Sequence, residues 1–339
     1  MRLTDIPGKA RRRFRSKIVT LFRGRPCYPK LYRSYWHCRF SAPVSHGTAD
    51  QYYAAVPHRG AGIGHQLANW IAGYWFARQL GLRFAHTPFA SPTWEHFLGF
   101  GDGETKVSQL LDQGYKRVRL PLFDEFNARE VELQRQIIAS YGRNRVVFVA
   151  EQDQFYRDQF GVMDDLKRKF HGAPARQADH LIYSPEQFNI AVHVRRGDIA
   201  GAAAKKNANL QMRWQDAGYF VRVLTAIGGN LQTSKPVVIH LFSQGTPDEF
   251  QEFKQFRNLR LCLDMSAQES FLHMVRADLL ITSKSGFSYK PALLSNGIKI
   301  CPRTFWHGYP QSPDWILAEE DGTLPLSQFR QQFNRPDLS

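Results

Sequence analysis

The second half of the chain alternates short apolar runs with longer amphipathic segments, and this alternation limits the folds open to it more than any other feature. Apolar runs that predict buried strands cover 188–194, 237–242, 259–263, 279–282 and 298–301. Helical spacing of apolar residues predicts helices over 214–227, 247–255, 267–276 and 289–295. Alternating strands and helices form a parallel sheet covered on both faces, so we expect a doubly wound α/β domain.

The first half shows the same alternation less regularly. Strands are predicted over 51–57, 82–85, 120–123 and 145–150, and helices over 67–80, 128–141 and 153–171. The stretch His171–Ala175, HGAPA, indicates a domain boundary. Because 339 residues exceed one simple core, we predict two Rossmann-like domains, an N-terminal one over 46–175 and a C-terminal one over 176–339.

Basic residues are concentrated in a tail over residues 1–45. The formal net charge is +15, and residues 1–40 contain 12 Lys or Arg against one Asp. Apolar residues at helical spacing among these arginines predict a basic amphipathic helix that contacts an anionic membrane surface. A tail packed on the body with its charges in water is the alternative. The body carries 33 basic and 29 acidic residues, a balance that argues against a nucleic-acid partner.

The chain shows neither an apolar run of about eighteen residues nor an apolar signal segment at its start. These observations predict no membrane span and a cytoplasmic location, at the inner face of the membrane if the tail binds there. Its cysteines, Cys27, Cys38, Cys262 and Cys301, lack the spacing of disulfide frameworks or zinc sites. We therefore expect a reducing compartment and no bound metal.

The strand at 188–194 leads directly into two arginines. Residues 188–198 read FNIAVHVRRGD, so a buried run is followed by Arg195, Arg196 and Asp198. Ligands of open α/β sheets bind at the carboxyl ends of strands, and guanidinium groups suit phosphate oxygens. This peptide therefore predicts an anionic ligand, although surface ion pairs are an alternative role for the arginines. The sequence does not rank Arg195 above Arg196.

Two further strand ends carry polar groups. Ser243 follows the strand at 237–242, and the peptide 283–288, SKSGFS, follows the strand at 279–282. Hydroxyls and amides at a strand-to-helix turn suit a diphosphate, and parallel strands bring such turns to one edge. Earlier in the chain, Gly60, Gly62 and Gly64 precede a predicted helix, where close backbone approach to a ligand and a plain tight turn are both open. Together the strand ends favour a nucleotide-diphosphate site.

These peptides resemble those of the GDP-fucose-dependent fucosyltransferases of the α1,2, α1,6 and protein O-fucosyltransferase superfamily. The group's His-x-Arg-Arg-x-Asp peptide is matched by His193, Arg195, Arg196 and Asp198. Its GxGxGxQL peptide is matched by Gly60, Gly62, Gly64, Gln66 and Leu67. Its C-terminal peptide is matched by Ala277, Asp278, Leu280, Ser285, Phe287 and Ser288. Departures at His65, Ile199, Lys284 and Gly286 leave the subfamily and the sugar open.

The resemblance implies a GT-B type architecture, with two Rossmann-like domains facing across a cleft. It implies a glycosyltransferase that moves a sugar, first of all fucose from GDP-fucose, to a glycan hydroxyl with inversion and without a metal or other cofactor. A surface polysaccharide or a lipid-linked glycan would be the acceptor. A non-catalytic nucleotide-sugar or carbohydrate-binding protein on the same scaffold is the alternative, because no carboxylate of the first half stands out as a base.

The resemblance also implies roles for individual residues. The candidate catalytic residues are Arg195, Arg196 and Asp198. The candidate donor-binding residues are Gly62, Gly64, His65, His193, Ser243, Glu269, Ser285, Gly286 and Phe287. One arginine would meet the β-phosphate and the other would brace the site, while Asp198 would act as the base or hold an arginine. His193 would contact the base or ribose, and Glu269 the guanine amino group.

Overall fold

The computed structural model describes residues 17–18, 21–22, 25–28, 31, 51–121, 123–142, 144–149, 157–199, 208–263 and 265–333. Of Asp198, Ala208 and Asn209 it describes the backbone only. Of the predicted helix of the basic tail, the structure describes Lys17, Ile18, Leu21 and Phe22, which are helical, and the rest lies outside the described residues. Among the residues that are described, no helix has the length and apolar character needed to cross a bilayer.

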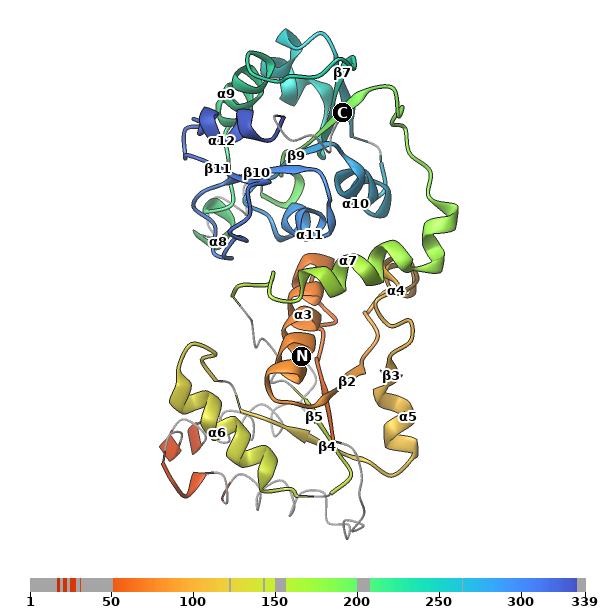
Figure 1. Ribbon diagram of the computed structural model, residues 1–339, viewed down its shortest axis with the longest axis vertical. Coiled ribbons are helices and arrows are strands. Elements are labelled where there is room, and N and C mark those ends of the chain that lie inside the picture. The colour runs from red at the N-terminus through yellow and green to blue at the C-terminus, as the bar shows by residue number, and fades with distance from the viewer. Residues whose placement is uncertain are drawn as a thin grey trace, which may run out of the picture. The chain divides into compact units, whose positions relative to one another are not determined.

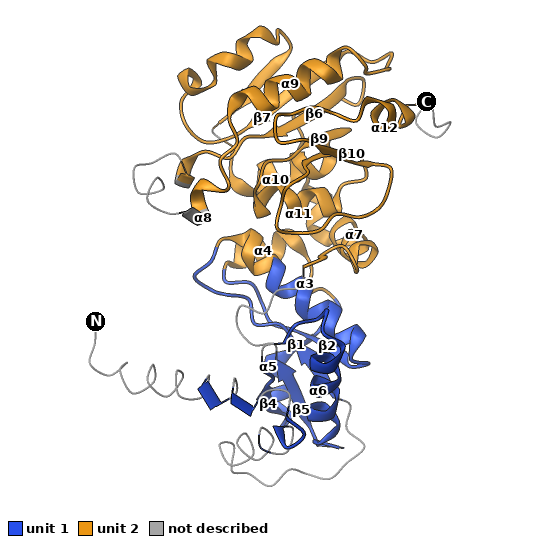
Figure 2. Cartoon of the chain, turned by 90° about the vertical axis from the view of Figure 1, so that its left-hand side faces the viewer, with its two compact units in different colours: residues 1–61, 68–90, 103–156 blue, residues 62–67, 91–102, 157–339 orange. Residues whose placement is uncertain are grey.

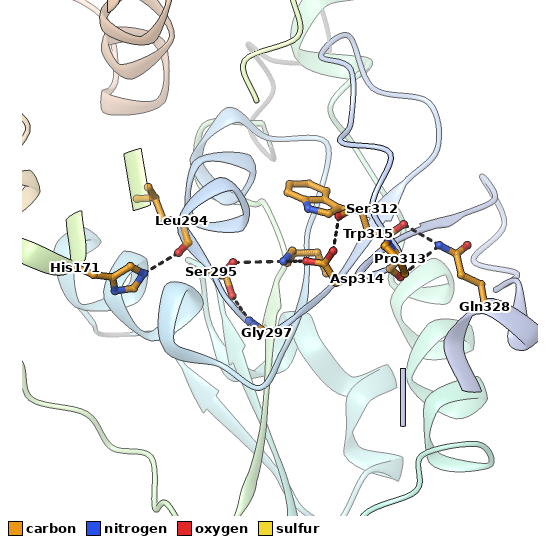
Figure 3. Close-up of polar contacts among 10 residues, drawn as sticks. His171, Leu294, Ser295, Gly297, Ser312, Pro313, Asp314, Trp315 and Gln328 are labelled. Carbon is orange, nitrogen blue, oxygen red and sulfur yellow. Dashed lines mark hydrogen bonds and ion pairs between the residues drawn. The ribbon is translucent and has the colours of Figure 1, made fainter. Parts of the chain in front are cut away.

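The chain divides into two compact units, coloured separately in Figure 2. The first contains Met1–Ala61, Ala68–Ala90 and Gly103–Tyr156, and the second contains Gly62–Leu67, Ser91–Asp102 and Arg157–Ser339. The second unit thus begins upstream of the predicted boundary at 175/176. The reason is that α7, Met163–Gly172, packs on it: His171 Nε2 donates to the Leu294 carbonyl at 2.9 Å (Figure 3).

The first unit contains a five-stranded parallel sheet in the order β3-β2-β1-β5-β4. Its strands are β1 Tyr52–Ala54, β2 Arg83–His86, β3 Thr105–Lys106, β4 Lys116–Arg119 and β5 Val146–Val149. Its helices are α5 Val107–Asp112, α6 Ala128–Ala139 and most of α3 Ile63–Gln79, whose first residues belong to the second unit. Apolar residues of β1, β2, β5 and α5 form a buried cluster.

The second unit contains a six-stranded parallel sheet in the order β11-β10-β9-β6-β7-β8, of which Figure 1 labels β7, β9, β10 and β11. Its strands are β6 Phe188–His193, β7 Val237–Phe242, β8 Leu259–Cys262, β9 Leu279–Ile281, β10 Ile298–Pro302 and β11 Trp315–Ala318. Besides α7, its helices are α4 Pro92–Leu98, α8 Ala208–Gln211, α9 Ala217–Gly228, α10 Ala267–Arg276, α11 Gly286–Leu294 and α12 Leu326–Gln331. Helices α9 and α12 pack on one face of the sheet, and α10 and α11 lie on the other.

These sheets confirm the predicted α/β class with two Rossmann-like domains. The strand predicted at 120–123 is wrong: β4 occupies Lys116–Arg119 instead. Pairing ends after Leu120, whose amide bonds the Val149 carbonyl, because Pro121 has no amide hydrogen to continue the ladder. The segment Pro247–Gln255 is a 3-10 helix, η5, with a kink at Phe250, and the prediction did not include β11 or α12.

An ion pair between a buried lysine and a partly exposed aspartate fastens the edge of the second sheet. Lys299 of β10 has a fully buried side chain that bonds the Asp314 carboxylate and, at 3.3 Å, the Ser295 carbonyl (Figure 3). Asp314 in turn accepts from the Ser312 hydroxyl. A buried charge needs such partners to offset the loss of its hydration, so this pair fixes the start of β11 against β10.

Candidate functional site

The strand order of the second sheet reverses between β6 and β9. Strands β7 and β8 follow β6 on one side, whereas β9, β10 and β11 are added on its other side. The loops after β6 and β9 therefore leave the same edge of the sheet in opposite directions, and such a switch point is where ligands of open α/β sheets bind. The His-x-Arg-Arg-x-Asp peptide follows β6 and the SKSGFS peptide follows β9, so the topology brings the two predicted anion-binding turns together.

His193 and Ser283 form the inner layer of this edge. His193 is 8% exposed, and its Nδ1 lies 2.7 Å from the Ser283 hydroxyl. Burial, and then the charge of Arg195, lower the pKa of His193 to about 3, so the ring is neutral near pH 7. Ser288 closes the network by accepting from the Ser283 amide at 3.2 Å. The ring can thus accept or donate hydrogen bonds but carries no charge.

Arg195 reaches from β6 to the turn after β9. This half-buried residue has its Nη1 3.3 Å from the hydroxyl of Ser285. Ser285 is the N-cap of α11, and its hydroxyl also accepts from the Phe287 amide at 3.2 Å. The guanidinium therefore lies at the amino-terminal turn of a helix, where backbone amides and a positive charge both favour an anion.

Arg196 is held in a different way. It is 7% exposed, and its Nη1 donates to the carbonyls of Arg195 at 2.9 Å and Gln215 at 3.1 Å. Its Cζ lies 4.2 Å from the centroid of the Trp214 ring. Burial lowers the pKa of Arg196, while Glu252, Glu249 and Asp216 oppose that shift. The Arg196 guanidinium is thus bonded to backbone carbonyls and lies over an indole ring, so it supports the loop. Arg195, in contrast, faces the turn after β9.

Gly64 brings the start of α3 against the start of α11. A Cβ atom added to Gly64 would lie 2.9 Å from the Gly286 carbonyl carbon and 3.1 Å from the Phe287 amide nitrogen. Glycine at position 64 thus allows two helix amino termini to approach each other. At Gly62 an added Cβ would meet nothing within 4 Å. Of the candidate glycines Gly62, Gly64 and Gly286, only Gly64 is required by close backbone approach, since an added Cβ at Gly286 would have its nearest neighbour at 3.9 Å.

The other candidate donor-binding residues form contacts of their own. The Gly62 carbonyl accepts from the His65 amide at 3.1 Å, so both belong to the first turn of α3. The Ser243 hydroxyl donates to the Val194 carbonyl at 2.6 Å and joins the ends of β7 and β6. The Phe287 ring centroid lies 5.5 Å from that of His193. These residues line the same sheet edge or the helix start that meets it.

Glu269 has a local role that the sequence prediction did not include. It forms a capping box at the start of α10, with its carboxylate 2.9 Å from the Ser266 amide and its own amide 3.2 Å from the Ser266 hydroxyl. Hydrogen bonds from Ser266 lower the pKa of this exposed carboxyl. The pattern Ser-x-x-Glu before an apolar run is readable in the sequence and indicates such a cap.

Asp198 lies in η3, the short 3-10 helix Gly197–Ile199, and its side chain lies outside the described part of the chain. The site also contains two residues that the sequence prediction missed, Gln215 and Trp214, which support Arg196. They follow the strand by about twenty residues, and no motif marks them. Within the described ranges, no three His, Cys, Asp or Glu side chains are grouped to hold a metal ion.

Comparison with known proteins gives matches of structure only. No protein-family model matches the chain, and no curated protein matches its sequence. The structural matches include NodZ α-1,6-fucosyltransferase co-crystallised with GDP, with 13% identity, a TM-score of 0.41, and coverage of 82% of this chain and 98% of that one. NodZ is also matched in a structure that names its source as Bradyrhizobium, at 13% identity, a TM-score of 0.40, and coverage of 74% of this chain and 94% of that one.

Two other matches concern different proteins. POFUT1 in complex with GDP has 10% identity and a TM-score of 0.44, over 77% of this chain and 99% of that one. The heptosyltransferase WaaC of E. coli with ADP has 14% identity and a TM-score of 0.32, over 60% of this chain and 55% of that one. Matches at this level transfer no residue role to the chain, so a function has to be argued from its own side chains.

Proposed function

We propose that this chain is a glycosyltransferase that uses a nucleotide-diphosphate sugar, with GDP-fucose as the first candidate donor. The observation that carries the proposal is the hydrogen bond across the β6/β9 switch point, in which Arg195 Nη1 lies 3.3 Å from the Ser285 hydroxyl. A guanidinium beside a helix amino terminus at this edge suits the oxygens of a diphosphate. Gly64 supports the same role, since it lets the start of α3 approach that turn.

The proposed reaction is an inverting displacement. The acceptor hydroxyl attacks the anomeric carbon from the side opposite the diphosphate, the bond from that carbon to the β-phosphate oxygen breaks, and the hydroxyl proton passes to a base. Negative charge grows on the departing oxygen, so the Arg195 guanidinium stabilises the transition state more than the ground state. This charge would supply the stabilisation that a divalent cation supplies elsewhere, and we therefore propose metal-independent transfer.

The neighbouring residues have distinct proposed roles. Arg196 positions the loop through two backbone carbonyls and does not itself meet the phosphate. His193 is neutral near pH 7, so it would hold the ribose or base by hydrogen bonds rather than donate a proton as an acid. For Asp198 we propose that it holds one of the two arginines by a charge-assisted bond, with the role of the base as its alternative.

The acceptor is proposed to be a glycan or a lipid-linked glycan, and the location cytoplasmic, with the basic tail contacting the inner face of the membrane. The tail part of the proposal is tested by flotation with anionic liposomes. Full-length protein should float, and protein lacking residues 1–40 should not. Equal flotation would overturn the membrane contact and leave the site proposal unaffected.

The donor is tested by calorimetric titration with GDP, UDP and GDP-fucose, each with magnesium and with EDTA. We expect GDP and GDP-fucose to bind equally well in both media, and UDP to bind more weakly. A panel of glycan acceptors should then release GDP from GDP-fucose. Binding without release would favour the non-catalytic nucleotide-sugar-binding protein. If none of the nucleotides binds, the glycosyltransferase proposal is wrong.

A further inference from the structure

Gln215 touches both halves of the proposed diphosphate site. Its side-chain Oε1 accepts a hydrogen bond from the Lys284 amide at 2.8 Å, and its backbone carbonyl accepts from Arg196 Nη1 at 3.1 Å. Lys284 is the residue before Ser285 in the turn after β9, whereas Arg196 belongs to the loop after β6. A single residue that is 8% exposed therefore bonds the loops on both sides of the switch point.

The segment around Gln215 is anchored at both ends. Asp216 is the N-cap of α9 and accepts from the Tyr219 amide at 2.8 Å, and α9 packs into the core of the second unit. On the other side, the Trp214 ring lies under Arg196, and Arg213 Cζ lies 5.0 Å from the ring of Trp306, beyond β10. Gln215 thus holds the two loops from a fixed position.

The bond to Lys284 bears on the anion-binding turn. Without an acceptor, the Lys284 amide would be left unsatisfied at this part-buried position, which is costly enough to move the turn. A shift of Lys284 carries Ser285 with it, because they are adjacent, and Ser285 is both the N-cap of α11 and the partner of Arg195. The geometry of the phosphate site therefore depends on a residue that need not touch the ligand.

We infer that Gln215 is a positioning residue for the diphosphate: its side chain holds the turn before α11 and its carbonyl holds Arg196, so that the two loops meet the ligand as one unit. This inference rests on the proposed function. The positioning role concerns the phosphates in particular, because Gln215 bonds the loop that contains the two arginines and the turn that leads into α11.

The test compares GDP with GMP, which lacks the β-phosphate, on the full chain. Gln215→Met keeps the length of the side chain but removes the acceptor, and we expect it to weaken GDP binding about tenfold and GMP binding less than about twofold. Gln215→Glu keeps an acceptor oxygen and should recover most of the GDP affinity. Gln215→Asn, one methylene shorter, repeats the test with a polar side chain if the Met variant does not fold. Gln251→Met, which changes an exposed glutamine of η5, is the control and should bind both nucleotides like the wild type.

The outcomes separate the inference from the proposed function. If the wild type binds GDP but Gln215→Met binds it equally well, the positioning role is wrong and the proposed function stands. Equal losses for GDP and GMP in Gln215→Met and Gln215→Asn, with no recovery in Gln215→Glu, would reduce the residue to a general structural role and also overturn the inference. If the wild type binds neither nucleotide, the proposed function itself is wrong.

Discussion

The two sheets reverse their strand order in similar ways, but the residues at the two reversals differ. In the first sheet the reversal lies between β1 and β5, where Ala54, Ala55 and Val149 are at most 2% exposed. Gly73 of α3 packs so closely there that an added Cβ would lie 2.5 Å from the Ala55 Cβ. In the second sheet the reversal between β6 and β9 carries Arg195 and Ser285.

The difference shows that strand order provides a place where a ligand can bind, while the side chains there decide whether the place binds one. At the first reversal, the described residues Ala54, Ala55 and Val149 are buried and Gly73 packs against Ala55. The second places a guanidinium and a helix start in contact and suits an anion. If this contrast is correct, substitutions at the second reversal should change ligand binding, whereas substitutions at the first should change stability.

Removal of the Arg195 side chain should have the largest effect on ligand binding. We expect Arg195→Ala to weaken GDP binding by at least about a hundredfold, because charge-assisted hydrogen bonds to a phosphate are worth about 1.5–3 kcal/mol each. Arg119→Ala, at the end of β4 in the first unit, is the matched control and should stay within about twofold of the wild type. Calorimetry measures both affinities. Equal losses in the two variants would show that the ligand does not bind at the second reversal.

The helix contact at Gly64 gives the next largest effect. Gly64→Ala places a Cβ 2.9 Å from the Gly286 carbonyl carbon, so the helix starts must separate. We expect GDP affinity to fall about tenfold, since small-to-large changes against a fixed backbone cost about 1–3 kcal/mol. Gly228→Ala, at the end of α9, where the new Cβ meets nothing within 4 Å, is the control. A Gly64→Ala protein that binds GDP like Gly228→Ala would show that the contact is not needed for binding.

The first reversal is tested through Gly73. Gly73→Ala should lower the free energy of unfolding by about 1–2 kcal/mol, because the clash with Ala55 outweighs the gain in helix propensity of about 1 kcal/mol. GDP affinity of the folded protein should not change. Denaturant unfolding and calorimetry measure the two quantities, with Gly172→Ala, whose Cβ meets nothing within 4 Å, as the control. A loss of GDP affinity without a loss of stability would contradict the packing role.

The last prediction concerns the charge state of His193. Its pKa is lowered to about 3 in the folded protein, against an ordinary value of 6.5, so between these pH values the unfolded chain binds a proton that the folded chain does not. Stability should therefore rise with pH across this window and level off above it. His193→Gln should reduce the slope by up to about 1.4 kcal/mol per pH unit. Unfolding at several pH values measures the slope, and an unchanged slope would show that His193 is charged in the fold.

The individual strand ends were predictable, but their pairing was not. Apolar runs followed by polar turns locate the ends of β6 and β9 in the sequence, and both strands are close to their predicted bounds. Nothing in the sequence places β9 beside β6, since about ninety residues separate them. The bonds from His193 to Ser283 and from Arg195 to Ser285 depend on that order.

The same distinction applies to individual residues. Arg195 and Arg196 are adjacent and chemically alike, and only the position of Gln215 and Trp214 shows that Arg196 is occupied by the protein itself. The glycine peptide contains three glycines, yet only the contact with Gly286 shows which one needs to lack a side chain. The capping role of Glu269, by contrast, could have been predicted from the sequence, because a capping box is a local pattern.

Periodicity and turn residues were enough to predict the α/β class, the parallel strands and the places where polar groups follow them, because these patterns act over a few neighbours in the chain. The folded structure was needed to show which strand ends meet, which arginine faces the helix start, and that Gln215 joins the two loops. These features depend on strand order and on hydrogen bonds between residues far apart in the chain, which no local pattern encodes.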